Sequence, residues 1–346
     1  MSSSSSAFVS YLRQHRDRID ACVSAHVPAM ESHDTQAADL DRYLYAPAAR
    51  FVTSGGKRTR PALCLLGAHA VGAPEERAYS VAAAVELFQA CALIHDDIAD
   101  KSELRRGQPC VHVAEGTGIA VNVGDSILVS VVSTILADDA LSQQTRLRLL
   151  DEIVCMENRT LEGQALDLGW ARDGRWDISA EDYLAMATRK TAYYSAAIPL
   201  AMGAICGGGT EQQVEGLRAY GMRCGLAFQI QDDLLNLTGD ASAQGKDFRS
   251  DITEGKRTLV MVWALAHLDG ANKEELLGIL ASKTVDMAAL ARAVELAESC
   301  GALAHAQAYA QQLIGSAKAD LNGLPIDDDA RKVLISMADF FVERAS

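Results

Sequence analysis

Two pairs of adjacent aspartates lie inside apolar stretches of this 346-residue chain. The first pair is Asp96–Asp97, which is followed by Asp100, and the second pair is Asp232–Asp233. Side chains four residues apart lie on one face of a helix, so Asp96 and Asp100 can reach the same hard cation. A single Asp-Asp pair favours a helix cap or a surface acid pair. Two pairs, each within a long apolar run, favour a magnesium site that holds a diphosphate.

Basic side chains cluster near these aspartates in the sequence. The segment Gly55–Pro61 contains three of them, together with glycines that let the backbone approach an anion. Arg105 and Arg106 follow the first aspartate pair by a few residues, and arginine binds phosphate groups in a bidentate manner. Each cluster alone is typical of a solvated turn. Together with the aspartates, they predict one diphosphate held through metal and another held by guanidinium and ammonium groups.

The composition favours a helical protein. Hydrophobic residues make up 49% of the chain and aromatic residues only 5%, with much Ala and Leu. No Pro-rich linker or shift in composition marks a domain boundary. We therefore expect an all-α fold, a single large bundle of about ten helices over residues 8–346, preceded by a disordered tail at residues 1–7.

Helical periodicity defines the expected elements. It predicts helices over residues 8–30, 58–71, 77–100, 118–138, 143–167, 180–205, 212–238, 257–268, 287–314 and 328–344. A polar segment over residues 240–256 follows the second aspartate pair. A loop in that position is either a lid over the site or an ordinary surface connection, and its two Gly-Lys pairs favour the lid.

Charge and cysteine usage exclude several classes of protein. The net charge of −14 argues against nonspecific nucleic-acid binding. The eight cysteines are scattered without a CxxC pair, which indicates reduced thiols in a cytoplasmic protein, with Cys64, Cys91 and Cys206 in the core. The N-terminus lacks a secretory signal, and no uninterrupted apolar run of about 18 residues predicts a transmembrane segment.

The ordered motifs resemble the trans-isoprenyl diphosphate synthase family, also called the polyprenyl synthetases, and especially its bacterial farnesyl and geranylgeranyl diphosphate synthases. The matching motifs, in family order, are Gly55-Gly56-Lys57-Arg58-x-Arg60-Pro61, Glu86-Leu87-Phe88-Gln89, the first aspartate motif with Arg105-Arg106-Gly107, Gly163-Gln164-x-x-Asp167-Leu168, Lys190-Thr191, Phe228-Gln229-x-x-Asp232-Asp233, Gly245-Lys246 and Gly255-Lys256-Arg257-Thr258. The resemblance implies a helical bundle of the isoprenoid synthase type with a central active-site cavity, a homodimer, and isopentenyl and allylic diphosphates as substrates.

The resemblance also assigns roles to the acidic residues. It implies that Asp96, Asp100 and Asp232 ligate about three Mg²⁺ ions that bind the allylic diphosphate. It implies that Asp97 and Asp233 support these ligands from behind or balance the charge of the site.

Further roles follow for polar and basic residues. The resemblance implies that the allylic diphosphate contacts Arg105, Lys190 and Lys246, with Lys256 helping to close the site. Thr191 and Gln229 would line the carbocation with oxygens, and the released diphosphate would take the proton that the product loses. The pocket for isopentenyl diphosphate would consist of Lys57, Arg60, Gln89 and Arg106.

The sequence departs from the family pattern at three positions. Gln89 stands where many relatives carry His, and its amide still donates a hydrogen bond to phosphate. Asn236 stands where a third Asp is common, which predicts a slightly weaker metal affinity. Asp247 stands where Pro is frequent, and the sequence offers no physical account of it.

Product length is expected to depend on the helix that precedes Asp96. Cys91 and Ala92, one turn back, are small, whereas farnesyl-type relatives often carry bulky aromatics there. The next large residue on that face is Phe88, about 12 Å along the axis. This depth favours a geranylgeranyl (C20) over a farnesyl (C15) or a longer product (C25 or more). A floor formed by Met156 or by Tyr193–Tyr194, with Phe88 as plain core, is the alternative.

Three other functions compete with this interpretation. A class I terpene cyclase shares the first aspartate motif, but it has no need for a second diphosphate pocket. A noncatalytic regulatory subunit usually goes with lost aspartates, and these are retained. A calcium-binding helical module is disfavoured because the sequence has no EF-hand loop spacing.

Overall fold

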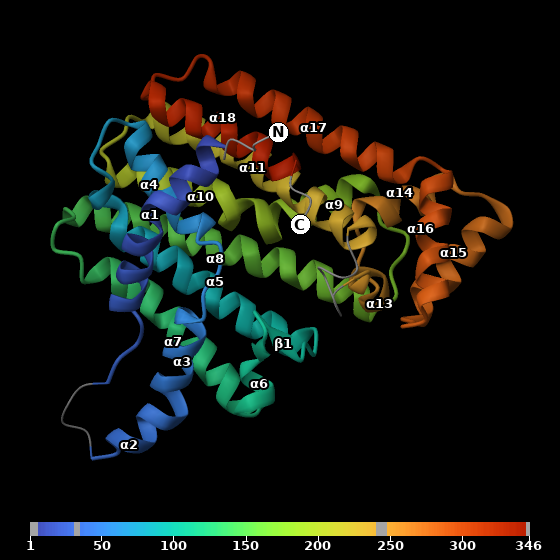
Figure 1. Ribbon diagram of the computed structural model, residues 1–346, viewed down its shortest axis with the longest axis horizontal. Helices are drawn as coiled ribbons and strands as arrows, with labels where there is room; N and C mark the ends of the chain where they lie inside the picture. Colours follow the sequence, from blue (N-terminus) through green and yellow to red (C-terminus); the bar gives the residue numbers. More distant parts are fainter. Residues whose placement is uncertain (1–5, 31–34, 240–247, 344–346) are drawn as a thin grey trace. The chain divides into compact units, whose positions relative to one another are not determined.

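The computed structural model describes residues 6–30, 35–239 and 248–343 (Figure 1). Most of these residues are helical, and the one sheet among them is a hairpin of strands β1 (Leu104–Arg105) and β2 (Gln108–Pro109). The prediction of an all-α fold is confirmed. The chain divides into two compact units: unit 1 holds residues 1–154, 198–217 and 325–333, and unit 2 holds residues 155–197, 218–324 and 334–346.

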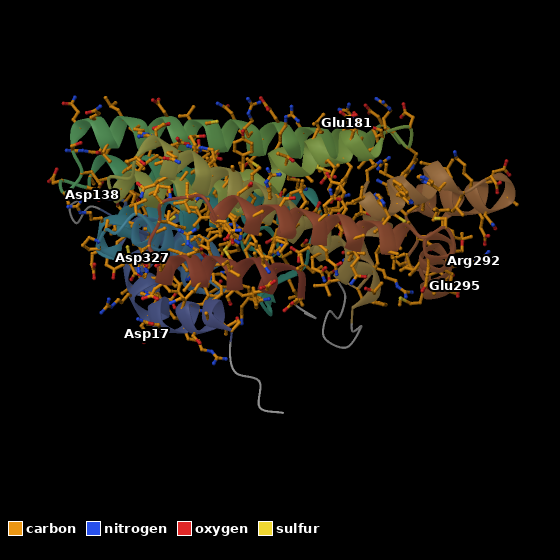
Figure 2. All side chains as sticks on the ribbon, turned by 90° about the horizontal axis from the view of Figure 1, so that it is seen from above. Asp17, Asp138, Glu181, Arg292, Glu295 and Asp327 are labelled. Carbon is orange, nitrogen blue, oxygen red and sulfur yellow. The ribbon has the colours of Figure 1, made fainter. Side chains whose placement is uncertain are left out.

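Three helices contribute residues to both units: α8 (Gln143–Arg172), α11 (Glu211–Thr238) and α18 (Asp328–Glu343). The prediction of a single domain stays a prediction. Charged side chains lie on the surface of each unit, as exposed Asp17 in unit 1 and exposed Glu181 in unit 2 illustrate (Figure 2).

Unit 1 is built around one apolar helix, α5. Its elements, besides parts of the three shared helices and the hairpin, are α1 (Ala7–Ala25), α2 (Ala37–Leu40), the π-helix η1 (Asp41–Tyr45), α3 (Ala46–Thr53), α4 (Thr59–Ala70), the 3₁₀-helix η2 (Glu75–Ala78), α5 (Tyr79–Ala99), α6 (Val111–Ala114), α7 (Thr117–Leu136) and α10 (Ile198–Cys206).

Glycines set the close packing of the unit 1 helices. A Cβ atom at Gly203 of α10 would lie 1.9 Å from the backbone oxygen of Cys64 on α4. A Cβ atom at Gly124 of α7 would lie 2.3 Å from the imidazole of His95 on α5. Only glycine permits the backbone approach at Gly203, so α10 packs directly against α4 there. Cys64, Cys91 and Cys206 are buried, as predicted.

Unit 2 contains the remaining helices. Its elements, besides parts of the three shared helices, are α9 (Ala180–Ala187), the π-helix η3 (Thr188–Ala197), α13 (Ser250–Glu254), α14 (Leu259–His267), α15 (Gly270–Ser282), α16 (Met287–Ser299) and α17 (Ala302–Leu321). A Cβ atom at Gly163 of α8 would lie 2.3 Å from the backbone nitrogen of Lys190, so this glycine lets α8 pack directly against η3.

The helix predictions were wrong in two respects. The predicted helix over residues 287–314 is broken at Gly301, whose φ of 78° ends one helix and begins the next. The helical stretch from α2 to α3 and helix α15 were not predicted, and α15 was missed because its apolar residues form no clear stripe. Residues 240–247 of the predicted lid lie outside the described residues.

Two helical stretches are long and apolar enough to cross a membrane by length and composition alone: Glu75–Ala99, with 72% of its most apolar window buried, and Thr117–Leu136, with 39% buried. Core helices of folded proteins pass the same test, so the expectation of no transmembrane segment stays a prediction. The low burial of the second stretch shows that α7 exposes apolar surface.

Candidate active site

The first aspartate pair lies in the last turn of α5. The backbone N–H of Asp100 donates to the backbone oxygen of Asp96 at 2.8 Å, so these two residues stand one helical turn apart on the same face. Both are half-buried. Lys101, with a φ of 55°, adopts the left-handed conformation that ends the helix. The structure therefore gives Asp96 and Asp100 the shared face that the sequence predicted.

Asp97 has a different environment from its neighbour. It is 1% exposed, and its Oδ1 accepts a hydrogen bond of 2.9 Å from Nε of Arg105 and a second one from the Nη2 group. The hairpin delivers this arginine through a tight turn in which Arg106 and Gly107 both have positive φ. Burial alone would lower the pKa of Arg105, but the hydrogen bond and the charge of Asp97 raise it overall. Asp97 thus holds Arg105 in place and cancels a buried charge.

The two basic segments of unit 1 come together around Arg106. Its guanidinium lies 5.9 Å from the ring centre of Phe51 and donates to Oγ of Ser54 at 3.1 Å. Gly56 has a φ of 125°, and a Cβ atom there would lie 2.9 Å from Nη2 of Arg106. The glycine is therefore required by its backbone conformation, and the guanidinium of Arg106 packs directly against it. Burial lowers the pKa of Arg106.

Arg58, at the centre of the first basic segment, is a structural residue. It is 5% exposed and pairs with Glu86 at 2.5 Å and with Asp20 at 2.7 Å. These contacts tie α1, α4 and α5 together. The flanking cations differ from it, because Lys57 is exposed and Arg60 is half-buried. Among the three basic residues of this segment, the predicted anion-binding residues are therefore Lys57 and Arg60, whereas Arg58 has a structural role.

The second aspartate pair lies on α11 in unit 2, where a chain of hydrogen bonds surrounds its second member. Asp233 is 6% exposed and accepts 2.7 Å hydrogen bonds from the hydroxyl of Tyr183 and from the amide of Gln229. The amide oxygen of Gln229 accepts a 2.7 Å hydrogen bond from the hydroxyl of Thr191. Asp232 is half-buried. The chain fixes which end of the Gln229 amide is oxygen.

Burial raises the pKa of Asp233 to about 8, and the nearby charge of Asp251 adds to the effect. Burial likewise raises the pKa of Asp251 to about 6, although Lys256 opposes the shift. Two carboxyl groups placed this close in a buried region disfavour each other's ionisation. A cation at this position would relieve that cost.

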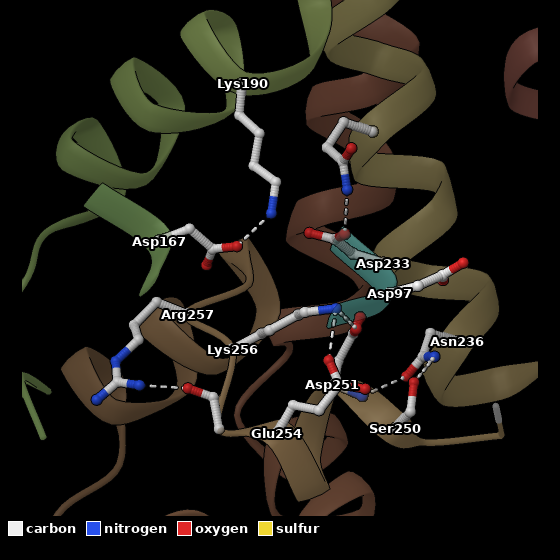
Figure 3. A network of polar contacts seen from close by, with 12 residues as sticks. Asp97, Asp167, Lys190, Asp233, Asn236, Ser250, Asp251, Glu254, Lys256 and Arg257 are labelled. Carbon is white, nitrogen blue, oxygen red and sulfur yellow. Dashed lines mark hydrogen bonds and ion pairs between the residues drawn. The ribbon is translucent and has the colours of Figure 1, made fainter. Parts of the chain in front are cut away.

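Lys190 and Lys256 each pair with carboxylates in unit 2 (Figure 3). Lys190, on the π-helix η3, forms a close ion pair with Asp167 of α8. Lys256 lies 2.6 Å from Glu254 and 3.6 Å from Asp251. Both ammonium groups are thus held by acidic partners in unit 2. Lys246, which the sequence also predicted, lies outside the described residues.

Asn236 has a structural role in addition to its predicted one (Figure 3). Its amide nitrogen donates to Oγ of Ser250 at 3.1 Å, and its amide oxygen accepts from the backbone N–H of Asp251 at 3.2 Å. These contacts attach the start of α13 to α11. The side chain therefore positions Asp251.

The carboxylates suit magnesium by type. Hard cations prefer oxygen ligands, and Asp96, Asp100 and Asp232 are half-buried while the second aspartate of each pair is buried. Within the described ranges no three His, Cys, Asp or Glu side chains are close enough to hold an ion by themselves. The aspartates thus fit a metal that keeps part of its coordination for water or substrate oxygens. The number of ions stays a prediction.

Other predicted residues lie along α5. Phe88 and Cys91 are buried, whereas Gln89 and Ala92 are half-buried. Sequence reasoning missed the role of Tyr183, because nothing in the sequence pairs it with an aspartate 50 positions away. It also missed the role of Asp251, which lay in a segment interpreted only as a lid.

Comparison with known proteins identifies a family that this chain matches. Residues 41–297 match the model of the polyprenyl synthetase family. The chain is 41% identical over 295 residues to the short chain isoprenyl diphosphate synthase of Methanothermobacter thermautotrophicus, which covers 85% of this chain and 88% of that protein. It is 33% identical over 353 residues to the geranylfarnesyl diphosphate synthase of Natronomonas pharaonis, which covers 97% of each chain.

A solved structure is also similar. The geranylgeranyl pyrophosphate synthase of Corynebacterium glutamicum, complexed with isoprenyl diphosphate and magnesium, has a TM-score of 0.84 and 32% identity. The match covers 96% of this chain and 98% of that one. The agreement extends over nearly the whole chain.

Proposed function

Because the chain belongs to the polyprenyl synthetase family, we propose that this prenyltransferase joins isopentenyl diphosphate to an allylic diphosphate and stops at geranylgeranyl diphosphate. The observation that carries the proposal is the common design of the two aspartate motifs. In each, the first aspartate is half-buried and the second is buried and held by hydrogen bonds. In this design the half-buried aspartates, Asp96 and Asp232, meet the metal-bound diphosphate.

Asp96, Asp100 and Asp232 hold magnesium in this proposal. The metal, when bound, neutralises the diphosphate that leaves the allylic substrate. Arg105 contributes a guanidinium to the same diphosphate, and Asp97 fixes its direction from behind. Lys190, Lys246 and Lys256 supply further positive charge around the leaving group.

The second substrate binds the basic cluster of unit 1. Arg106 is exposed with its guanidinium against the ring of Phe51, where it can meet an anion from solvent. Lys57 and Arg60 flank the structural Arg58, and Gln89 donates from α5. These four residues, Lys57, Arg60, Gln89 and Arg106, bind the diphosphate of isopentenyl diphosphate.

The hydroxyl of Thr191 and the amide oxygen of Gln229 stabilise the carbocation. The two oxygens are 2.7 Å apart, and the hydrogen bond from Gln229 to Asp233 keeps the amide nitrogen turned away from Thr191. Two partial negative charges are thus held side by side without a strong nucleophile to capture the cation. The double bond of isopentenyl diphosphate attacks C1, and the departing diphosphate takes the proton that the product loses.

The C20 product follows from the depth of unit 1 along α5. Cys91 and Ala92 offer little bulk one turn before Asp96, and buried Phe88 lies about 12 Å from Asp96 along the axis. Relatives named for geranylgeranyl and for geranylfarnesyl products both occur, so the names of the relatives do not decide the product length. The proposed C20 length is therefore argued from the residues of α5.

The test is a magnesium-dependent assay with isopentenyl diphosphate and dimethylallyl, geranyl or farnesyl diphosphate, with products separated by length. We expect C20 from all three starters, a shorter product from Ala92→Phe, and a longer one from Phe88→Ala. An unchanged product length in both variants would show that α5 does not determine the product length, although it would not contradict the proposed enzyme class. No elongation from any starter would refute the proposed reaction.

We also propose that the protein is a homodimer. Exposed apolar side chains recur every seven residues along α8, and α7 carries others. They are Leu147, Val154, Leu161 and Leu168 on α8, and Val121, Val129 and Leu136 on α7. Such stripes are costly to leave in water and are typical of helix pairing between subunits. Sedimentation should give a dimer, and Val129→Glu with Leu161→Glu should give monomers, whereas a monomeric wild type would refute the dimer.

A further inference from the structure

The guanidinium of Arg58 connects four elements of unit 1. Its Nε donates to Oδ1 of Asp20 on α1 at 2.7 Å, and its Nη1 donates to Oε1 of Glu86 on α5 at 2.5 Å. Its Nη2 donates to the backbone oxygen of Val52 on α3 at 3.0 Å, and Arg58 is itself the residue that begins α4. We call these contacts the Arg58 clamp. Because Arg58 is only 5% exposed, the clamp lies beneath the surface and meets no substrate itself.

The clamp closes the loop that joins α3 to α4. Val52 lies six residues before Arg58, so the hydrogen bond between them ties the two ends of this loop together. Gly55 and Gly56, inside the loop, have φ values of 103° and 125°. Arg58 has a φ of 52°, which is uncommon for a residue with a Cβ atom and persists where surrounding contacts offset its cost. The clamp therefore fixes the path of the backbone through the loop.

The same loop holds the residues of the second diphosphate pocket. Oγ of Ser54 accepts a hydrogen bond of 3.1 Å from Nη1 of Arg106, and the backbone at Gly56 packs against the same guanidinium. Lys57 ends the loop, and Arg60 lies in the first turn of α4. A displaced loop would therefore move Lys57, Arg60 and Arg106 together.

No other cation can replace Arg58 in the clamp. Glu86 is 3% exposed, and within the described part of the chain its Oε2 has no hydrogen-bond partner, so the bond from Arg58 to Oε1 compensates this carboxylate. Burial alone would lower the pKa of Arg58, but the charge of Glu86 and the hydrogen bond to Asp20 raise it overall. Lysine has a single ammonium group and cannot reach three acceptors that lie in different directions. Arg58→Lys thus keeps the charge and loses the geometry.

We propose that Arg58 is a positioning residue for isopentenyl diphosphate. The clamp sets the direction in which Lys57, Arg60 and Arg106 meet the diphosphate of this substrate. The proposal rests on the proposed function, because it requires that this basic cluster binds the second substrate.

The clamp is expected to act on one of the two substrates. Arg105, which contacts the allylic diphosphate, is held by Asp97 and not by the clamp. Arg58→Lys should raise the KM for isopentenyl diphosphate about tenfold, because misdirected groups lose charge-assisted hydrogen bonds. The KM for geranyl diphosphate should stay within about twofold, and kcat should be nearly unchanged. Glu86→Gln, which keeps the shape of the side chain, should act in the same direction by about threefold.

A double variant tests the route through the loop. Ser54→Ala removes the acceptor of Arg106 and should also raise the KM for isopentenyl diphosphate severalfold. If Arg58 acts by holding this loop, the two changes are not additive, so Ser54→Ala should add little in the Arg58→Lys background. Fully additive effects would contradict this route.

Two variants in unit 2 serve as controls. Tyr220→Phe removes a buried hydrogen bond to the backbone oxygen of Leu334 and controls for lost stability, which urea unfolding measures. Arg292→Lys makes the matched substitution at a guanidinium that also pairs with two carboxylates, those of Glu275 and Glu295. Both controls should leave the two KM values unchanged.

Three outcomes would overturn the proposal: no rise in Arg58→Lys, an equal rise of both KM values, or an equal rise in Tyr220→Phe. Calorimetric titration with isopentenyl diphosphate alone separates this proposal from the proposed reaction. There, Arg58→Lys should bind about tenfold more weakly than the wild type. A wild type that binds isopentenyl diphosphate without elongating would refute the reaction, and the Arg58 variants would still test the clamp. A wild type that does not bind it would refute both.

Discussion

The two aspartate motifs share a plan but neutralise their buried member differently. In unit 1 the buried Asp97 faces the guanidinium of Arg105, a full positive charge. In unit 2 the donors to the buried Asp233 among the described residues are neutral, the hydroxyl of Tyr183 and the amide of Gln229. A charge partner compensates a buried carboxylate, whereas neutral donors compensate it only in part. Burial raises the pKa of Asp233 to about 8 and the charge of Asp251 adds to the shift, while the two neutral hydrogen bonds oppose it.

The motifs also differ at their last position. Asp100 follows the end of α5, where it adds a second carboxylate on the face of Asp96. Asn236 lies one turn after Asp232 on α11, but its amide is bonded to Ser250 and Asp251. The first motif therefore places two carboxylates on one face, Asp96 and Asp100. The second combines one carboxylate, Asp232, with the structural contact of Asn236.

The largest effect is expected from removing the half-buried aspartate of either motif. Asp96→Asn and Asp232→Asn should each lower kcat by about 10³-fold or more, because loss of charge stabilisation of about 4 kcal/mol in the transition state has that consequence. The measurement is the rate of chain elongation at saturating Mg²⁺. Asp17→Asn, an exposed carboxylate outside both motifs, is the control. Near-normal turnover in either variant would contradict a metal-binding role for that aspartate.

The next effect concerns stability and separates the two ways of neutralising the buried aspartate. Arg105→Met leaves Asp97 buried without its partner and should lower the free energy of unfolding by about 3 kcal/mol. Tyr183→Phe removes one neutral hydrogen bond and should lower it by about 1 kcal/mol. Urea unfolding followed by circular dichroism measures both.

Arg172→Met provides the control for these two variants, because the exposed ion pair of Arg172 with Asp173 contributes little to stability. A larger loss in Tyr183→Phe than in Arg105→Met would reverse the comparison. It would mean that the hydrogen-bond chain, and not the ion pair, carries the greater part of the stability.

These contrasts mark how far the sequence alone could predict the site. The aspartates and the basic residues were found because their chemical types and their spacing are local properties. The separate roles of Arg58 and Arg106 were not, because they depend on whether Glu86 or Phe51 packs beside each guanidinium. The partner of Asp233, Tyr183, depends likewise on the packing of α9 against α11.

The fold shows the same limit. Strongly periodic helices such as α5 were predicted, since their apolar residues repeat over several turns. The break at Gly301 was missed because one glycine within a periodic stretch is also compatible with a continuous helix.

A smaller effect is expected on the pH dependence of stability without metal. The folded pKa of Asp233, about 8, lies above the value of an unfolded aspartate, so the folded state binds its proton more tightly. The free energy of unfolding should therefore fall as the pH rises from about 4 to about 8 in a chelator. Asp233→Asn should show a weaker dependence over this window, and an equal slope in both proteins would contradict the assignment. Denaturant titrations at several pH values provide the measurement.

The smallest effect tests the last position of the second motif. Asn236→Asp keeps the oxygen that accepts from Asp251 but loses the donor to Ser250 and adds charge beside Asp232. Without metal it should lower stability by about 1 kcal/mol, whereas in Mg²⁺ titrations of activity it should lower the half-saturating concentration severalfold. Asn236→Ala loses both contacts and offers no ligand, so it should raise that concentration. If both variants raise it equally, Asn236 acts only by attaching α13, and the two motifs differ in structure but not in metal affinity.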